Sequence, residues 1–347
     1  MRAVVLVGGF GTRLRPLTNT VPKPMLPVGH VPIIERLIDN LVRGGVTDVT
    51  LALGFRPEPF LEAFPDGTCA GATLRYAVEP EPLDTGGAIR FAALFAGIES
   101  TFVVANGDVL TDLDVGALAE FHRRNGAEAT LHLTPVEDPS AFGVVDSDAA
   151  GLVHRFIEKP PPGTAPSNLI NAGTYIFERS VIDRIPGGRK VSIEREVFPV
   201  MAADRRLWAM PTDDYWIDTG QPDLYLRANL DIITRLRAEH SWAHGVADGA
   251  VIAEGVALSD TIVANGARID AGADVSDSVL LAGAHIGAGA HVRSSVVMGR
   301  IGARAVVADC VIGAGAVTAD NHRDHARHVV RPPVRGQALG SGMRSPA

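Results

Sequence analysis

Strands and helices alternate along the first 230 residues, judged by the spacing of apolar positions. Between short apolar runs lie segments whose apolar residues recur every three or four positions, as on one face of a helix. The clearest is 32–43, where Ile33, Leu37 and Leu41 share a face and Gly44 ends the pattern. Four runs have the length of buried strands: 2–7, 46–53, 72–78 and 101–105. This alternation predicts an α/β fold with a mixed, mainly parallel sheet covered by helices.

The extended segments become longer after residue 128. Two further helices are predicted before that point, at 85–96 and from a cap at Asp114 to Arg123. The longer segments are typical of a mixed sheet with an inserted subdomain, and they cover 129–135, 142–146, 152–158 and 169–177.

A different periodicity begins near residue 245. Ile286, Val292 and Met298 are six positions apart, and Val306 and Ile312 resume the same step after one slip in phase. An aliphatic residue every six positions, with small residues between, is typical of a parallel β-helix. We therefore expect one domain at 1–240 and about four coils at 245–317. A flexible tail is expected at 318–347, including its histidines.

Charge and composition exclude several classes of protein. The net charge of -8 and the scattered arginines argue against a nucleic-acid binder, and no apolar run reaches the roughly 18 residues of a membrane span. Cys69 and Cys310 form neither a disulfide framework nor a metal knuckle, which favours the cytoplasm. All but three of the 32 basic residues are arginine, so Lys23, Lys159 and Lys190 indicate sites that need a compact ammonium.

A glycine-rich loop directly follows the first strand. Gly8, Gly9 and Gly11, together with Thr12, allow backbone N–H groups to approach an anion, and Arg13 adds a planar guanidinium suited to two phosphate oxygens. The glycine spacing matches neither the Walker loop nor the dinucleotide fingerprint. A tight turn with an exposed arginine is the alternative interpretation.

Two lysines stand beside prolines. Lys23 lies between Pro22 and Pro24, and Lys159 precedes Pro160. Because proline restricts the backbone, each ammonium is expected to be held in place for binding.

The stretch from Gly8 to Pro27 resembles the signature of the sugar-1-phosphate nucleotidyltransferases. The order of later motifs is most similar to the mannose-1-phosphate guanylyltransferases, and the resemblance covers about residues 1–315. It implies a Rossmann-like nucleotidyltransferase domain followed by a short left-handed parallel β-helix. It also implies that the nucleoside triphosphate is bound by the glycine loop with Arg13, and that Lys23 neutralises phosphate charge.

The same resemblance assigns roles to later motifs. Asp108, in Asn-Gly-Asp after a strand, and Asp218, in Trp-Ile-Asp-Thr-Gly, would share one Mg²⁺. Lys159 would bind the phosphate of the sugar and Glu158 its hydroxyl groups. Segments containing Gly143 and Asn171 resemble those lining the sugar pocket. Any one of these residues alone could belong to a surface turn.

Base selection depends on the loop from Glu79 to Gly87. The carboxylate of Glu79 can accept the two N–H donors of guanine, whereas uracil and thymine suit an amide; Gly86 is the other residue of this loop assigned to the nucleotide. The alternative is an acidic loop facing solvent.

The reaction implied is the transfer of a guanylyl group from GTP to mannose 1-phosphate. Two other functions stay open: a glucose-1-phosphate thymidylyl- or uridylyltransferase, and a non-catalytic subunit that binds GDP-mannose. We also expect a homo-oligomer formed through the β-helix, because the ends of a short solenoid need covering.

Overall fold

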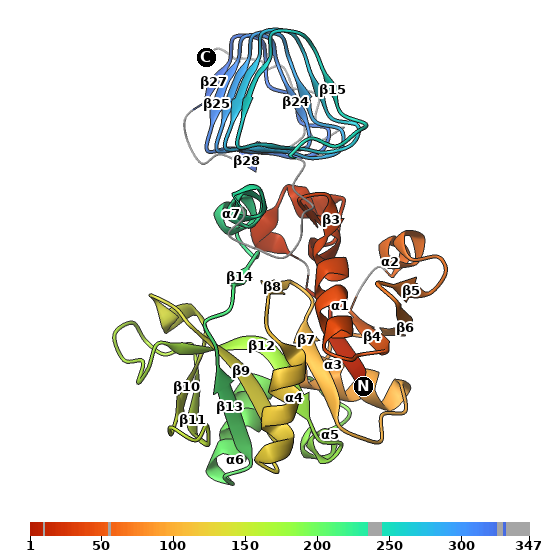
Figure 1. The fold of residues 1–347 in the computed structure, drawn as a ribbon, viewed down its shortest axis with the longest axis vertical. Helices are drawn as coiled ribbons and strands as arrows, with labels where there is room; N and C mark the ends of the chain where they lie inside the picture. Colours follow the sequence, from red (N-terminus) through yellow and green to blue (C-terminus); the bar gives the residue numbers. More distant parts are fainter. Residues whose placement is uncertain (10, 55–56, 235–244, 325–328, 331–347) are drawn as a thin grey trace, which may run out of the picture. The chain divides into compact units, whose positions relative to one another are not determined.

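The computed structural model describes residues 1–9, 11–54, 57–234, 245–324 and 329–330 (Figure 1). The chain forms two compact units. One contains the large sheet and most of the helical residues, and the other contains the coils together with Leu14–Thr20 and the segment that begins at Asn229. None of the helices described is both long and apolar enough to cross a membrane.

A ten-stranded sheet organises the first unit. Strand β1 (Arg2–Leu6) is central and pairs in parallel with β4 (Asp48–Leu53) and β7 (Phe102–Asn106). Strand β12 (Leu169–Phe177) runs antiparallel to β7 and carries the second half of the sheet. The mixed sheet is therefore confirmed, with its parallel pairs in the N-terminal half and between β9 and β13. The remaining strands are β5 (Thr68–Cys69), β6 (Ala72–Val78), β9 (Ala129–Pro135), β10 (Gly143–Ser147), β11 (Val153–Glu158) and β13 (Leu207–Pro211).

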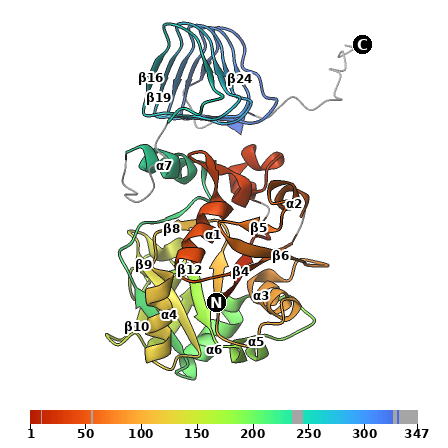
Figure 2. The same cartoon turned by 45° about the vertical axis from the view of Figure 1, so that its right-hand side comes forward.

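Helices cover both faces of this sheet (Figure 2). In β1, Val4 packs with α3 (Asp84–Phe95), while Val5 packs on the opposite face with α1 (Ile33–Arg43). Successive side chains of a strand point to opposite faces of the sheet, so each helical layer packs on its own apolar core. The other helices are α2 (Glu58–Ala63), α4 (Val115–Arg124), α5 (Ser180–Arg184), α6 (Phe198–Ala203) and α7 (Pro222–Ile233).

Short elements connect the main ones. A two-stranded pair joins β8 (Val109–Thr111) to β14 (Trp216–Asp218), and another joins β2 (Pro27–Val28) to β3 (Val31–Pro32). Single helical turns are η1 (Thr12–Leu14), η2 (Leu17–Asn19), η3 (Lys23–Met25), η4 (Pro139–Ala141) and the π-helical turn η5 (Ile193–Val197). The predicted cap is confirmed, since Asp114 Oδ1 accepts a hydrogen bond from Ala117 N at 2.9 Å.

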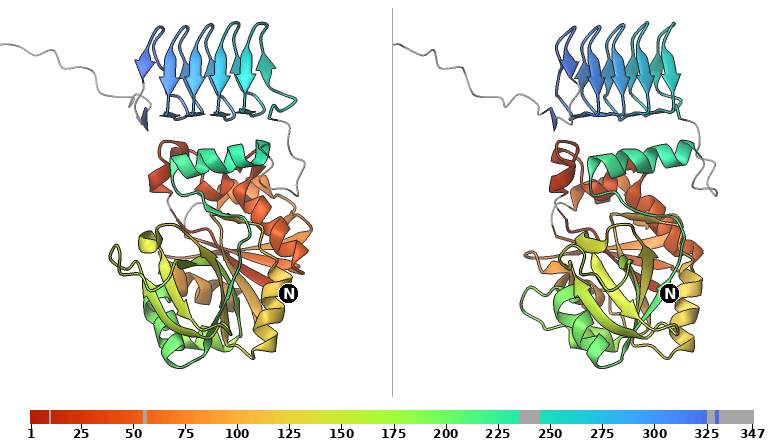
Figure 3. Two further views of the ribbon diagram at one scale, coloured as in Figure 1. Left: turned by 60° about the vertical axis from the view of Figure 1, so that its left-hand side comes forward. Right: turned by 90° about the vertical axis from the view of Figure 1, so that its left-hand side faces the viewer.

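The second unit is a left-handed parallel β-helix of stacked coils (Figure 3). Its first sheet contains β15 (Val251–Ile252), β18 (Arg268–Ile269), β21 (His285–Ile286) and β24 (Arg300–Ile301). The second contains β16 (Ala257–Ser259), β19 (Asp274–Ser276), β22 (His291–Arg293), β25 (Val306–Ala308) and β27 (Arg323–Asp324). The third contains β17 (Ile262–Val263), β20 (Val279–Leu280), β23 (Val296–Val297), β26 (Val311–Ile312) and β28 (Val329–Val330).

The slip in the six-residue pattern is a short coil. Arg268 pairs with His285, 17 residues onward, whereas His285 pairs with Arg300, only 15 residues onward. The aliphatic residues still stack inside, as Ile269, Ile286 and Ile301 do without any exposure.

The coils extend further than the sequence pattern indicates. Strand β27 pairs with β25, and β28 pairs with β26, beyond the boundary expected at residue 317. Arg323 and Asp324 interrupt the aliphatic period, so the pattern alone could not reveal this coil. The rest of the predicted tail, 325–328 and 331–347, lies outside the described residues.

Candidate active site

The glycine loop lies at the carboxyl end of β1, beside the end of β4. A Cβ on Gly54 would come within 3.2 Å of Gly8 O, so the two backbones approach at a distance that side chains would prevent. Gly11 has a φ of +57°, while a Cβ on Gly9 would meet nothing within 4 Å. Phe10 lies outside the described residues. The loop therefore borders open space, as a phosphate-binding loop requires.

A cavity of about 470 Å³ opens beside this loop. It lies at the carboxyl ends of the parallel strands, where open α/β sheets bind ligands. Its walls bring together most of the residues that the sequence assigned to a nucleotide, namely Gly8, Gly9, Gly11, Thr12, Arg13, Lys23, Glu79 and Asp108.

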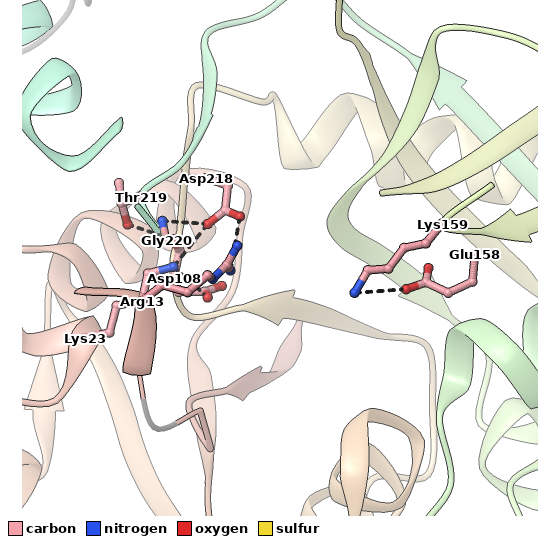
Figure 4. Close-up of polar contacts among 8 residues, drawn as sticks. All are labelled: Arg13, Lys23, Asp108, Glu158, Lys159, Asp218, Thr219 and Gly220. Carbon is pink, nitrogen blue, oxygen red and sulfur yellow. Dashed lines mark hydrogen bonds and ion pairs between the residues drawn. The ribbon is translucent and has the colours of Figure 1, made fainter. Parts of the chain in front are cut away.

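One ammonium and two carboxylates meet at the cavity (Figure 4). Lys23 Nζ lies 2.8 Å from Asp108 Oδ2 and 3.1 Å from Asp218 Oδ1, and the lysine side chain is only 6% exposed. Arg13 Nη2 is 3.9 Å from Asp218 Oδ2. The two acids predicted to act together are therefore adjacent in space.

Pairing of β8 with β14 brings these acids together. Asp218 stands opposite Val109, the residue after Asp108. Thr219 Oγ1 donates to Asp108 O at 3.0 Å, and Gly220 N donates to Asp218 Oδ1 at 2.8 Å. A Cβ on Gly220 would lie 2.8 Å from both Arg13 Nη2 and Asp218 Oδ1, so a side chain at this position would displace the charged groups of the cluster.

The donor set is suited to a divalent cation. Asp108 and Asp218 each have an oxygen within 3.1 Å of the Lys23 ammonium, so the two carboxylates are close enough to share one cation. Among the residues described, no cluster of three or more histidines, cysteines or acids could hold a metal. Two carboxylates with substrate oxygens completing the coordination is the arrangement that Mg²⁺ prefers.

Glu158 and Lys159 form a second group at the end of β11 (Figure 4). Lys159 has a φ of +51°, and its N–H donates to Phe142 O at 2.9 Å. Its side chain is 59% exposed, with Nζ 3.7 Å from Glu158 Oε1. Burial is the main cause of a raised pKa at Glu158, and the charge of Glu194 adds to it. A Cβ on Gly143 would lie 3.0 Å from Glu158 Oε2, so glycine leaves space for this carboxylate.

Asn171 is engaged with the protein rather than turned to an open surface. Its Nδ2 donates to Tyr175 Oη at 2.9 Å, and its Oδ1 accepts from Gly173 N at 3.2 Å. Its side chain therefore shapes the segment predicted to line the sugar pocket by supporting Tyr175.

Glu79 forms part of the cavity wall and is 8% exposed. Its Oε2 accepts from Leu83 N at 2.8 Å, and its Oε1 faces Gly8. Burial raises the pKa of this carboxyl, and the hydrogen bond from Leu83 opposes the rise. One oxygen is thus committed to the loop, and the other is directed toward the cavity.

Gly86 differs from its predicted role. Its N–H donates to Val191 O at 2.8 Å, and a Cβ there would lie 3.0 Å from the same oxygen. Gly86 allows α3 to pack closely and does not line the cavity, whereas its neighbour Thr85 does.

Sequence reasoning missed two residues of this region. Thr85 was assigned no role of its own, and Glu194, which accepts its hydroxyl hydrogen bond at 2.6 Å, was not singled out. No periodicity or motif joins residues 109 positions apart, so the sequence carried no signal for this contact.

This chain belongs to the nucleotidyl transferase family. The family described as Nucleotidyl transferase matches residues 2–235, and the one described as GlmU-like, C-terminal hexapeptide matches residues 237–330.

Two curated relatives share much of the sequence. A mannose-1-phosphate guanylyltransferase of Mycobacterium tuberculosis is 43% identical over 265 residues, 74% of this chain and 72% of the relative. A mannose-1-phosphate guanyltransferase of Schizosaccharomyces pombe is 43% identical over 241 residues, 68% of this chain and 66% of the relative. The chain thus spans 66–72% of these relatives' length.

Solved structures share the fold. HddC from Yersinia pseudotuberculosis is 29% identical with a TM-score of 0.57, covering 67% of this chain and 99% of that chain, and it has also been solved with GMP-PN. A putative glucose-1-phosphate thymidylyltransferase from Bacillus anthracis, in complex with a sucrose, is 24% identical with a TM-score of 0.60, covering 66% and 94%. This last likeness shows the fold alone.

Proposed function

We propose that this chain transfers a guanylyl group from GTP to mannose 1-phosphate, forming GDP-mannose and pyrophosphate. The observation that carries the proposal is the cluster of Lys23, Asp108 and Asp218 at a cavity bordered by the glycine loop. The relatives named as mannose-1-phosphate guanylyltransferases supply the substrates.

The nucleotide occupies the cavity beside the glycine loop. Backbone N–H groups of Gly8, Gly9 and Gly11 contact the phosphates, with Thr12 beside them, and Arg13 reaches phosphate oxygens with its exposed guanidinium. Guanine lies toward Glu79, whose Oε1 accepts from the base while Leu83 N–H holds Oε2.

Asp108 and Asp218 hold one Mg²⁺ in this proposal. Lys23 and Arg13 together balance only the charges of the two carboxylates, so the cluster by itself has no net positive charge to offset a polyphosphate. Mg²⁺ held by these two carboxylates would supply positive charge to polarise the α-phosphate and to stabilise the departing pyrophosphate. Gly220 N–H orients Asp218, and Thr219 anchors the backbone of Asp108.

The sugar phosphate lies toward the end of β11. Lys159 binds its phosphate, Glu158 accepts hydrogen bonds from sugar hydroxyls, and Gly143 leaves the space beside that carboxylate. Asn171 supports this side through Tyr175.

Transfer then needs no nucleophile from the protein. An oxygen of the sugar phosphate attacks the α-phosphorus of GTP as the bond to the bridging oxygen of pyrophosphate breaks. Lys23, Arg13 and Lys159 offset the repulsion between the two anions, and the protein contributes positioning and electrostatics.

We place the reaction in the cytoplasm and in a homo-oligomer formed through the β-helix. Cys69 and Cys310 are buried and neither forms a disulfide, which suits a reducing compartment. Burial raises the pKa of Cys69 to about 12, so its thiol is inert.

A substrate panel tests the assignment. Pyrophosphate release is measured for GTP, ATP, UTP and dTTP against mannose and glucose 1-phosphates. We expect GTP with mannose 1-phosphate to be the best pair by at least tenfold in kcat/KM. Preference for dTTP or UTP with glucose 1-phosphate would instead assign a thymidylyl- or uridylyltransferase, and binding of GDP-mannose without turnover would assign a regulatory subunit.

A further inference from the structure

Thr85 is fixed from two directions at the cavity wall. Its Oγ1 donates to Glu194 Oε2 at 2.6 Å and accepts from Ile193 N at 3.0 Å. Ser192 Oγ donates to the same oxygen of Glu194 at 2.8 Å. Glu194 Oε2 thus accepts hydrogen bonds from two hydroxyl groups. One of them belongs to Thr85, which lies in the first turn of α3 and lines the nucleotide cavity.

The charge of Glu194 also acts on the sugar side. The turn η5, which contains Glu194, packs against β11, whose last residue is Glu158. The charge of Glu194 raises the pKa of Glu158 and of the buried Tyr175. Among the described residues, no hydrogen bond reaches Glu194 Oε1. The carboxylate of Glu194 is therefore hydrogen-bonded to Thr85 on the nucleotide side of the site, and its negative charge acts on Glu158 on the sugar side.

The backbone around Glu194 is specialised. Ile193–Val197 forms the π-helical turn η5, and such single turns redirect side chains, frequently at functional sites. Ser192 caps the turn, because its Oγ accepts from Arg195 N at 3.3 Å. The turn is thus built to hold Glu194 against Thr85.

We propose that Glu194 is a positioning residue that links the two halves of the active site, holding Thr85 on the nucleotide side and setting the charge around Glu158 on the sugar side. The inference rests on the proposed function for the identity of the substrates. It goes beyond that function in assigning a residue that contacts neither reacting phosphate.

The two effects are separable by two substitutions. In Glu194→Gln the amide oxygen still accepts both hydroxyl hydrogen bonds, but the negative charge is gone. In Glu194→Ala the hydrogen bonds and the negative charge are all lost. We expect KM for GTP to rise roughly tenfold in Glu194→Ala and to stay within about twofold in Glu194→Gln.

The pH dependence of kcat/KM for mannose 1-phosphate reports the effect of the Glu194 charge. The groups that act on Glu158 are Glu194, Lys159 and Arg195. Since Glu194 raises the pKa of Glu158, removing its charge lowers that pKa. Both variants should therefore move the acid limb of kcat/KM for mannose 1-phosphate to lower pH, because Glu158 stays ionised further into acid.

Glu196→Gln is the matched control. Glu196 belongs to the same turn but is exposed; it pairs with Arg189 at 2.7 Å and accepts from Ser192 N at 3.2 Å. The amide oxygen of Gln keeps the bond from Ser192 while one negative charge of the turn is removed, so both readouts should match the unsubstituted protein. Equal rises in KM for both Glu194 variants with an unmoved acid limb would overturn the inference, as would no change in either variant.

The test also distinguishes failure of the proposed function. If the unsubstituted chain uses another nucleotide and sugar phosphate, the substrate assignment fails, and the same comparison on that pair still decides the role of Glu194. If the chain turns over none of these substrate pairs, the affinity of GTP for the three variants, measured by calorimetry, replaces KM as the measure of how Thr85 is held. An unchanged affinity in Glu194→Ala would then overturn the inference.

Discussion

Lys23 is the residue on which the candidate site depends. It lies 85 residues from Asp108 and 195 from Asp218, yet it contacts both. Its rarity as a lysine and its flanking prolines identified it from the sequence, and the structure adds the reason for an ammonium: a compact group can contact two carboxylates from a buried position.

Replacing an acid of this cluster should abolish most of the activity. We expect Asp108→Asn and Asp218→Asn each to lower kcat by about 100-fold or more, since the position then binds Mg²⁺ weakly. Pyrophosphate release measures the effect, and thermal unfolding should shift little. Asp213→Asn, an exposed acid on the segment leading to β14, is the control. Turnover near that of the control would refute the metal assignment.

Glu79 predicts a pH dependence of nucleotide binding. Its pKa is raised, so it takes up a proton at higher pH than an ordinary glutamate, and the carboxylate acceptor is lost as pH falls through that value. We expect KM for GTP to rise toward acid in the unsubstituted chain. In Glu79→Gln it should be about tenfold higher at neutral pH and insensitive to pH over this range. A pH-dependent rise of the same size in Glu79→Gln would exclude Glu79 as its source.

At the scale of elements, buried polar side chains in the strands and coils form hydrogen bonds with specific partners. His132, on β9, has no exposed surface, and its Nε2 lies 2.8 Å from Thr212 Oγ1. Burial lowers its pKa from 6.5 to about 4. The apolar periodicity identified β9, but it did not indicate that a histidine is buried there.

His132 should make the first unit less stable in acid. The unfolded chain binds a proton near pH 6.5 and the folded one only near pH 4, so the stability due to neutral His132 is complete above 6.5 and is lost as pH falls to about 4. The loss is about 3 kcal/mol by this shift. Urea unfolding, followed by fluorescence of Trp208 and Trp216, measures it. His132→Gln should show a shallower decline, and an identical slope would contradict the assignment.

The β-helix has a ladder of hydroxyl groups at one corner. Ser278 Oγ donates to Ser276 O at 2.6 Å and accepts from Ser295 N at 3.1 Å, and Ser295 Oγ accepts in turn from Cys310 N at 3.1 Å. The residues before each step have positive φ: Asp277, Ser294 and Asp309. The corner thus satisfies backbone groups that the sheets leave unpaired.

Removing one step should weaken the coils. Ser295→Ala removes the oxygen that accepts the hydrogen bond from the buried Cys310 N–H, and this loss costs about 1–3 kcal/mol. Amide hydrogen exchange at Cys310 should accelerate accordingly. Ser276→Ala, which keeps the carbonyl acceptor, should leave the rate unchanged; equal protection in both variants would mean that the ladder adds no stability.

At the scale of the molecule, strand β15 of the solenoid exposes apolar side chains at a sheet edge. Val251 and Ile252 of β15 are 56% and 38% exposed at an edge of the first sheet. Exposed apolar edge strands associate with another strand or surface. This supports the homo-oligomer proposed through the β-helix.

Charge on that edge should disrupt assembly. We expect the double substitution Val251→Lys and Ile252→Lys to lower the mass measured by light scattering to that of one chain. Val200→Lys, at an exposed valine of α6, should leave the mass unchanged. An undiminished oligomer in the edge variant would place the interface elsewhere.

By itself, the sequence determined the local elements and their chemistry. Apolar spacing predicted the longer strands of the large sheet, the helices α1, α3 and α4 and the stacked coils, because burial of one face imposes a period on the residues that form it. The strands predicted were β1, β4, β6, β7, β9, β10, β11 and β12, whereas the two- and three-residue strands β2, β3, β5 and β8 are too short to show a period. Motif composition identified Lys23, the glycine loop and both acids.

Tertiary structure alone decided which of these groups meet. The pairing of β8 with β14 sets Asp218 beside Asp108, helix packing turns Gly86 away from the cavity, and η5 holds Glu194 against Thr85. Such contacts join residues distant in the chain, and they depend on which surfaces pack together and not on any local repeat. The short helices α5 and α6 were missed for the same reason, since their few apolar residues gain burial only against the assembled sheet.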